Sequence, residues 1–331
     1  MGKREFAKDR YKTLPYRRCG DSGLMLPAVS LGFWQRLGEP GNERLCRDCC
    51  YYAFDHGVTH FDLANNYGPP PGNSERVVGK ILTDMPRDEL VVSTKAGYWM
   101  WPGPYGDGGG KKYLVASLDQ SLKRLGLDYV DIFYHHRPDD ETPLAKTFAA
   151  LDLIVRQGKA LYVGVSNYSG KQFLAAAELI AERGWSPITI HQPCYNMLNR
   201  TVEADLLAHT HAAGTGVIAF CPLAQGLLTD RYLDGLPDDA RFARSDAGRK
   251  QYESFVASAG PEKIRRLNAI ATGRDQSLAQ MALTWLLRDT RVTSVLVGVS
   301  SVRQLQDNIS AANAPALTTD ELNRIDTILA D

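Results

Sequence analysis

The stretch YVDIFYHHRPDDETPLAKTFAALDLIVRQGKALYVGVSN (129–167) holds one complete repeat of the pattern that decides the fold. Two apolar runs, 129–136 and 160–167, flank an amphipathic segment at 143–157. Short apolar, β-branched runs are typical of strands buried on both faces, and the intervening segment is long enough for a helix. The stretch therefore predicts a strand–helix–strand unit with parallel strands.

The same pattern continues on both sides of this unit. Six more runs share its character: AVSLGF (28–33), THFDLA (59–64), LVVSTK (90–95), ITIHQ (188–192), GVIAFC (216–221) and SVLVGVS (294–300). Helical patterns lie between them, at 42–56, 74–82, 113–125, 169–183 and 201–213. Eight such repeats close a parallel sheet into an α/β (β/α)8 TIM barrel, and an open doubly wound sheet is the alternative.

No Pro-, Ser- or Gly-rich linker divides the chain, so we expect one domain over 1–331 with the barrel proper at about 28–315. Three segments lie outside the repeat. The segment 14–27 resembles a β-hairpin that would close the bottom of the barrel. Long loops follow the third and seventh strands, at 97–112 and 223–261, and such loops are typical of lids over a catalytic face.

Composition narrows the functional classes. The 331 residues are 44% hydrophobic, which predicts a globular core, and 38 basic residues balance 38 acidic ones, which argues against a nucleic-acid partner. The charged N-terminus has no apolar segment, so we expect neither a signal peptide nor a membrane anchor. Six cysteines fit a reducing compartment, and we expect a cytoplasmic protein.

Two short motifs suggest metal ligands but have simpler explanations. Cys46, Cys49 and Cys50 fall within a helical pattern with no matching Cys/His pair nearby, so core packing is expected. His209 and His211 fit an exposed helix end. We therefore predict no metal site.

Four ionisable side chains stand at or just after neighbouring strand ends: Asp62, Tyr67, Lys95 and His136. Each alone has a structural explanation, such as a helix cap, an ion pair or a core histidine. Together they indicate catalysis, because buried charges are costly to keep for stability alone. A protonated tyrosine beside a lysine ammonium is a proton donor suited to a carbonyl oxygen, and a bound nicotinamide is the expected hydride source.

These motifs resemble the aldo-keto reductases. The resemblance rests on GVTHFDLANNYG, STKAG, YVDIFYHHR, ALYVGVSN, FCPLAQGLLTDRY and VGVSSVRQLQDNI, and it runs from about residue 14 to the end. It implies a catalytic tetrad of Asp62, Tyr67, Lys95 and His136, with His135 in a supporting role. The loop after the third strand and PPPGNSE (69–75) resemble the branch of bacterial L-glyceraldehyde 3-phosphate reductases, relatives of potassium-channel β-subunits.

The resemblance also implies NADPH lying across the rim of the barrel. Its implied contacts are Trp34, Asp62, Ser166, Asn167, Gln192, Phe220, Cys221, Pro222, Leu223, Gln225, Gly226, Arg231, Arg241, Gly298, Ser300, Gln304, Asp307 and Asn308. Many NADPH-dependent relatives bind the 2′-phosphate of the cofactor with an arginine near the position of Gln304. In this sequence the nearby cation is Arg303, one position earlier, and Asp307 occupies a position where relatives often have Glu. We expect NADPH rather than NADH.

The substrate implied by the branch is a small phosphorylated aldehyde, or methylglyoxal and similar carbonyls. Trp34, Tyr67, Trp101, His136 and Arg137 are the expected substrate contacts, and Trp99 is a further candidate for the apolar wall. Lys111 and Lys112 are further candidate cations, although solvated surface is the simpler explanation for each basic residue.

Two alternatives to a reductase stay open. The chain could be a cofactor-binding regulatory subunit of the channel β-subunit type with slow catalysis, or a structural barrel with a vestigial site. Relatives in this branch form tetramers or octamers, so a homo-oligomer is expected on resemblance alone.

Overall fold

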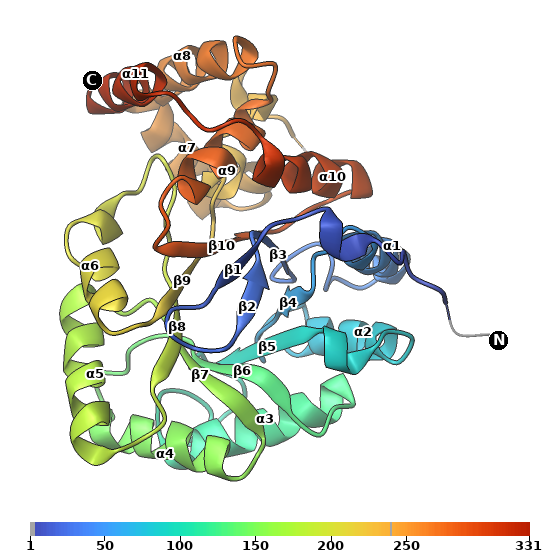
Figure 1. Ribbon diagram of the computed structural model, residues 1–331, viewed down its shortest axis with the longest axis vertical. Coiled ribbons are helices and arrows are strands. Elements are labelled where there is room, and N and C mark those ends of the chain that lie inside the picture. The colour runs from blue at the N-terminus through green and yellow to red at the C-terminus, as the bar shows by residue number, and fades with distance from the viewer. Residues whose placement is uncertain (1–3, 239) are drawn as a thin grey trace.

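The computed structural model describes residues 4–238 and 240–331. Eight parallel strands close into a barrel in the order β10-β3-β4-β5-β6-β7-β8-β9 (Figure 1). They are β3 (Val29–Gly32), β4 (His60–Asp62), β5 (Val91–Ala96), β6 (Val130–His135), β7 (Ala160–Ser166), β8 (Ile188–Gln192), β9 (Gly216–Ala219) and β10 (Val292–Val297). The predicted TIM barrel is confirmed, and the open sheet is excluded.

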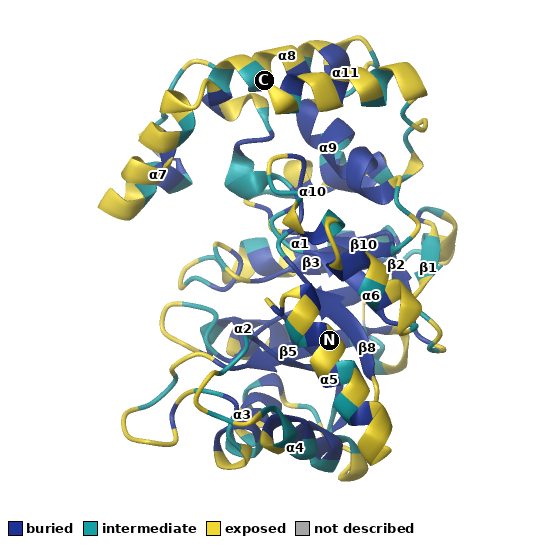
Figure 2. Ribbon diagram, turned by 90° about the vertical axis from the view of Figure 1, so that its left-hand side faces the viewer, coloured by how far each residue is buried: buried dark blue, intermediate teal, exposed yellow. Residues whose placement is uncertain are grey.

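Helices surround this barrel and extend beyond one side of it (Figure 1). They are α1 (Glu43–Asp55), α2 (Asn73–Leu82), α3 (Lys111–Leu125), α4 (Leu144–Arg156), α5 (Gly170–Arg183), α6 (Leu206–Ala212), α7 (Asp246–Ala257), α8 (Gly260–Thr272), α9 (Leu278–Leu287), α10 (Val302–Ser310) and α11 (Thr319–Ala330). Figure 2 shows the strands buried and the outer faces of several helices exposed. Apolar helix faces therefore bury against the barrel, as amphipathic patterns require.

The predicted strands are all present, with shifted ends. β10 begins two residues before the predicted 294, and β9 ends two residues before the predicted 221. The helix predicted at 201–213 is interrupted: a short 3-10 helix, η3 (Thr201–Glu203), precedes α6. The interruption falls at Asp205, whose φ of −149° lies outside the helical region.

The predicted hairpin consists of β1 (Tyr16–Arg18) and β2 (Met25–Pro27), which pair antiparallel. Cys19 and Leu26 pack against Ile190 and other inward-facing strand residues, so the hairpin closes the barrel from below. Gly20 makes this approach possible. A Cβ there would lie 1.9 Å from the carbonyl oxygen of Gly214, which precedes β9.

The long segment after β9 is largely helical, which the sequence did not predict. It contains η4 (Ala224–Gly226), η5 (Asp230–Tyr232), η6 (Arg241–Arg244), α7 and the start of α8. Tyr232, Phe242 and Tyr252 form a small apolar cluster within it. The segment therefore has its own core and is a structured flap rather than an open loop.

The cysteines of the CxxCC motif, Cys46, Cys49 and Cys50, are fully buried on α1, which confirms core packing. Among the described residues, no helix is long and apolar enough to cross a bilayer.

Candidate active site

Asp62 and Lys95, both fully buried, and the half-buried Tyr67 form a chain of contacts at the carboxyl ends of β4 and β5. Asp62 ends β4, and β5 pairs with it in parallel so that Asp62 is level with Ser93, two residues before Lys95. The Lys95 ammonium bonds to the Asp62 carboxylate and to the Leu63 carbonyl oxygen at 2.8 Å. The Tyr67 hydroxyl lies 3.5 Å from the same ammonium. The spacing of strand ends along the sequence thus produces one contiguous cluster.

His136 lies directly after β6 and packs against this cluster. Its ring meets the Tyr67 ring edge-on, with centroids 5.8 Å apart. Its Nδ1 is buried and has no hydrogen-bond partner among the described residues. The four predicted catalytic side chains are therefore brought together on one rim.

Burial controls the protonation of these groups. It raises the pKa of Tyr67 well above its ordinary value, and the nearby Asp62 carboxylate adds to the rise. Burial also lowers the pKa of Lys95, against the attraction of Asp62, and lowers the pKa of His136 with help from the Lys95 charge. At neutral pH the phenol is protonated and the imidazole is neutral.

A chain of hydrogen bonds inside the barrel ends on Asp62. Ser93 donates to Asp62 Oδ1 at 2.7 Å, so its oxygen is free to accept from His60 Nε2 at 3.0 Å. Because His60 then carries its proton on Nε2, its Nδ1 accepts from Ser30 at 2.9 Å. Ser294 completes the chain, 2.7 Å from Ser30. Every donor points toward the carboxylate and stabilises its negative charge.

The cluster opens into a cleft of about 1600 Å³ that runs over the rim. The predicted cofactor contacts all line it: Trp34, Asp62, Ser166, Asn167, Gln192, Phe220, Cys221, Pro222, Leu223, Gln225, Gly226, Arg231, Arg241, Gly298, Ser300, Gln304, Asp307 and Asn308. Tyr67 and His136 line its inner end. Trp34 and Asn308, which lie at opposite ends of the barrel sequence, thus share one surface.

Polar side chains near the tetrad are already held by internal hydrogen bonds. Gln192 Nε2 donates to Asp62 Oδ1 at 3.2 Å, and Ser166 donates to the Gln192 carbonyl oxygen at 2.8 Å. Asn167, in the left-handed region with φ 61°, donates to the His136 carbonyl oxygen at 2.9 Å. These contacts fix the amide groups at one end of the cleft.

The other end of the cleft is formed by the start of α10. Ser301 caps this helix by accepting from the Gln304 N–H, and Gly298 leaves open space where a side chain would stand. Arg303 also lines this end. A helix N-terminus with a nearby arginine favours anionic groups. Asp307 is turned toward α9, where it accepts from Ser277 at 2.9 Å.

The flap after β9 reaches across the cleft to the loop after β3. The Arg241 guanidinium lies 4.2 Å from the centre of the Trp34 ring, and Arg244 lies 3.7 Å from a Glu39 carboxylate oxygen. These two contacts bridge the walls, so a ligand in the cleft would lie beneath them.

Two predicted substrate contacts are placed elsewhere. Within the described part of the chain, neither Trp101 nor Arg137 lines the cleft. Trp101 packs against Tyr113 with ring centroids 5.2 Å apart, and Arg137 pairs with Asp107 at 3.0 Å. Both side chains therefore make contacts within the loops that follow β5 and β6.

Tyr98, and not the predicted Trp101, lines the cleft beside His136. It meets the His136 ring edge-on at 4.7 Å. Its position three residues after Lys95 was the available signal, because residues just beyond a strand end face the same rim. Asn66, Arg36 and Arg244 are further lining residues that the sequence did not single out.

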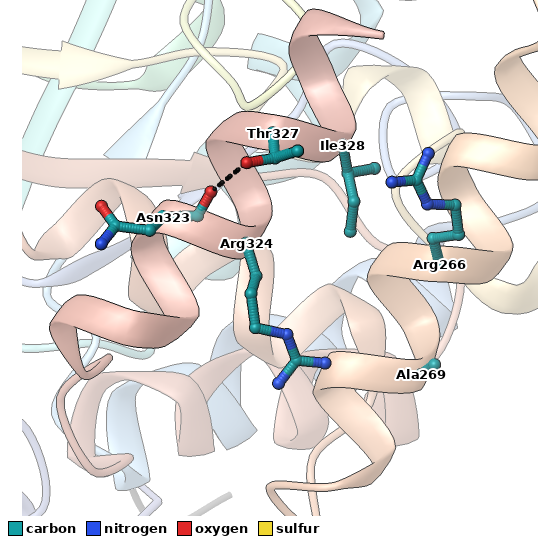
Figure 3. A pocket seen from close by; sticks show the side chains of 6 residues that line it. All are labelled: Arg266, Ala269, Asn323, Arg324, Thr327 and Ile328. Atoms are coloured by element: carbon teal, nitrogen blue, oxygen red, sulfur yellow. Dashed lines mark hydrogen bonds between the residues drawn. The ribbon is translucent and has the colours of Figure 1, made fainter.

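A smaller cavity of about 440 Å³ lies between α8 and α11 (Figure 3). Arg266, Ala269, Asn323, Arg324, Thr327 and Ile328 line it. Arg266 pairs with Asp331, and the Thr327 hydroxyl donates to the Asn323 carbonyl oxygen at 2.8 Å. This cavity is lined by none of the four predicted catalytic residues, so the larger cleft is the candidate active site.

A closed parallel barrel with an Asp–Lys–Tyr chain at its carboxyl rim fits one class of enzyme, and comparison with known proteins agrees. The aldo/keto reductase family model matches residues 28–330. The chain belongs to this family and is an oxidoreductase.

The most similar relatives narrow the branch. The chain is 53% identical to L-glyceraldehyde 3-phosphate reductase of Escherichia coli O157:H7, over 98% of this chain and 94% of that protein. It is 33% identical to a probable voltage-gated potassium channel subunit beta of Arabidopsis thaliana, over 96% of this chain and 97% of that protein. The predicted resemblance is confirmed both for the aldo-keto reductase family and for the branch of L-glyceraldehyde 3-phosphate reductases and channel β-subunits.

Proposed function

We propose that this protein reduces small aldehydes with NADPH, that L-glyceraldehyde 3-phosphate and methylglyoxal-like carbonyls are its substrates, and that Tyr67 is the general acid. The observation that carries the proposal is the Asp62–Lys95–Tyr67 chain opening into the long cleft. The 53% identity to a named L-glyceraldehyde 3-phosphate reductase supports the substrate.

The cleft fits a dinucleotide. It has fixed amide and hydroxyl groups near the tetrad, the aromatic ring of Phe220, and arginines toward the start of α10. Asn66 Oδ1 and His136 Nδ1 are buried and have no hydrogen-bond partner in the described structure, so both atoms can still form hydrogen bonds to a ligand. A bound reduced nicotinamide supplies hydride to the carbonyl carbon. Ser166, Asn167 and Gln192 would hold its carboxamide, and Arg303 would face the 2′-phosphate.

Tyr67 provides the proton for the carbonyl oxygen. Its raised pKa keeps the phenol protonated at neutral pH, and the Lys95 ammonium 3.5 Å away stabilises the phenolate that forms on transfer. The sequence predicted that Lys95 tunes this acid. In the structure the Lys95 ammonium is bonded to Asp62, and burial together with the Asp62 carboxylate raises the pKa of Tyr67. The net tuning therefore favours the protonated form.

Neutral His136 orients the substrate beside Tyr67. A neutral imidazole donates one N–H without adding charge, which suits a carbonyl oxygen that must still receive a proton. Tyr98 and Trp34 supply apolar surface on the same side of the cleft. Arg36, which also lines the cleft and is exposed, is the cation we assign to a substrate phosphate in place of Arg137.

The test is NADPH oxidation at 340 nm with methylglyoxal and with each enantiomer of glyceraldehyde 3-phosphate, repeated with NADH. We expect faster turnover with NADPH and a preference for the L-phosphate. Arg36→Ala should raise KM for the phosphorylated substrate and leave methylglyoxal unaffected. Tight NADPH binding without turnover on any of these carbonyls would contradict the proposal and favour a regulatory role like that of the channel-subunit relatives.

We also propose a cytoplasmic homo-oligomer, tetramer or octamer, formed by the single barrel domain. The support is the similarity to reductase and channel-subunit relatives over nearly the whole chain. Light scattering coupled to size-exclusion chromatography measures the assembly, and a monomeric mass would contradict it.

A further inference from the structure

Two thiols meet at the edge of the cleft, outside the tetrad. Cys221 lines the cleft just after β9, and Cys194 is half-buried just after β8. The segments run side by side, because Cys194 forms a parallel bridge with Phe220 and the Phe220 N–H donates to the Pro193 carbonyl oxygen at 2.9 Å. The two cysteines are therefore neighbours across the bridge.

Backbone contacts hold the two cysteines close together, and their side chains are near enough for each to affect the pKa of the other. The backbone at Cys221 turns into the left-handed region, with φ 52°, and its carbonyl oxygen accepts from Asn196 at 3.0 Å. These contacts thus hold Cys221 close to Cys194.

The other cysteines have different surroundings. Cys19, Cys46, Cys49 and Cys50 are fully buried in apolar clusters. The neighbouring Cys221 thiol lowers the pKa of Cys194 to about 7, whereas the pKa of Cys221 is raised. At neutral pH the partly exposed Cys194 is therefore partly ionised beside a protonated thiol, which is the arrangement of a redox-reactive pair.

We propose that Cys194 and Cys221 are a modification site that hydrogen peroxide or a related hydroperoxide converts to a disulfide. The Cys194 thiolate attacks one peroxide oxygen, the O–O bond breaks, and the departing hydroxide is protonated to water. The Cys221 sulfur then attacks the resulting sulfenic sulfur, an S–S bond forms, and hydroxide leaves and takes the Cys221 proton. Two thiols are oxidised, and the peroxide is reduced to two waters.

The disulfide alters the cofactor side of the cleft. An S–S bond is about 2.05 Å long, so it draws Cys221 toward Cys194 and moves the wall between Phe220 and Pro222. This consequence rests on the proposed function, although formation of the bond does not. If oxidation weakens cofactor binding, bound cofactor must oppose oxidation by the same factor.

The experiment treats the full-length protein with hydrogen peroxide and maps disulfides by mass spectrometry of a non-reducing digest. We expect one cross-linked peptide pair, joining Cys194 to Cys221, while the four buried cysteines stay reduced. Cys221→Ser should stop at the sulfenic acid on Cys194, which dimedone traps. Cys194→Ser is the matched control and should give no cross-link. A cross-link between other cysteines overturns the proposal. So does an alkylation assay on the untreated protein in which Cys194 reacts with iodoacetamide no faster than the buried cysteines.

A second measurement separates this proposal from the proposed function. NADPH binding is titrated before and after oxidation, and we expect at least tenfold weaker binding, restored by dithiothreitol and unchanged by peroxide in Cys194→Ser. Equal affinity in both states overturns the effect on the cleft. Absence of reductase activity in the reduced protein counts against the proposed function, and the disulfide map still decides the modification site.

Discussion

Lys95 Nζ lies 3.5 Å from the Tyr67 hydroxyl oxygen while the same ammonium bonds to the Asp62 carboxylate. Lysine's four-carbon stem is flexible, and the bond to Asp62 is what fixes its charge beside the phenol. The two contacts support separate roles in the proposed mechanism, with Tyr67 as the proton donor and Lys95 as the charge that stabilises the phenolate.

Tyr67→Phe removes the proton donor and leaves the rest of the cleft in place. We expect turnover to fall by roughly 10²–10⁴-fold, as for loss of a general acid, with the NADPH dissociation constant changed less than twofold. Steady-state kinetics and a fluorescence titration measure the two quantities. Wild-type turnover in this variant would show that another group protonates the substrate.

Lys95→Met leaves Asp62 as an unpaired buried carboxylate. We expect the free energy of unfolding to fall by about 3–5 kcal/mol, and the double variant with Asp62→Asn to recover much of this loss without recovering activity. Lys159→Met is the matched control, because Lys159 pairs with Asp119 at 2.7 Å on the surface, where a pair contributes about 0–1 kcal/mol. Equal losses in both single variants would contradict a buried ion pair. Urea unfolding measures all four proteins.

Acid should destabilise the protein through His60. Burial lowers the pKa of His60 to about 4, from about 6.5 when unfolded. As pH falls below 6.5 the unfolded chain binds a proton that the folded protein excludes, so stability declines until folded His60 also titrates near pH 4. Between pH 7 and pH 5 this one group removes about 2 kcal/mol.

Urea unfolding of His60→Asn at the two pH values checks this slope. We expect a smaller loss of stability on acidification than in wild type. His211→Asn, on the exposed surface of α6, serves as the control and should keep the wild-type slope. An unchanged slope in His60→Asn would show that other groups account for the acid sensitivity.

The contact between Arg241 and Trp34 should slow release of the cofactor. Arg241→Lys keeps the charge but loses the planar stacking on the indole ring, and Trp34→Ala removes the ring. We expect about tenfold faster NADPH dissociation in each, because cation–π contacts contribute about 0.5–2 kcal/mol. Stopped-flow displacement measures the rate. Arg288→Lys, which stacks on Trp285 away from the cleft, is the control.

The tetrad could be predicted because barrel topology is simple. Parallel strands place all their carboxyl ends on one rim, so Asp62 and Lys95 at successive strand ends had to be neighbours. Which loop side chains line the cleft could not be derived in this way. Trp101 and Arg137 follow strands as Tyr98 does, but loop packing turns Trp101 onto Tyr113 and pairs Arg137 with Asp107.

The sequence by itself determined the barrel, the hairpin and the rim that carries the candidate active site. Hydrophobic periodicity and the number of strands can be obtained from local stretches of sequence. Only the tertiary structure decided the distances and the surroundings. It joined His60 to Asp62 through Ser93, and it placed Cys194 and Cys221 on segments that run side by side. It also folded the segment after β9 into a flap over the cleft. Such contacts depend on how residues far apart in the chain pack, and burial at those contacts sets the pKa values on which the chemistry depends.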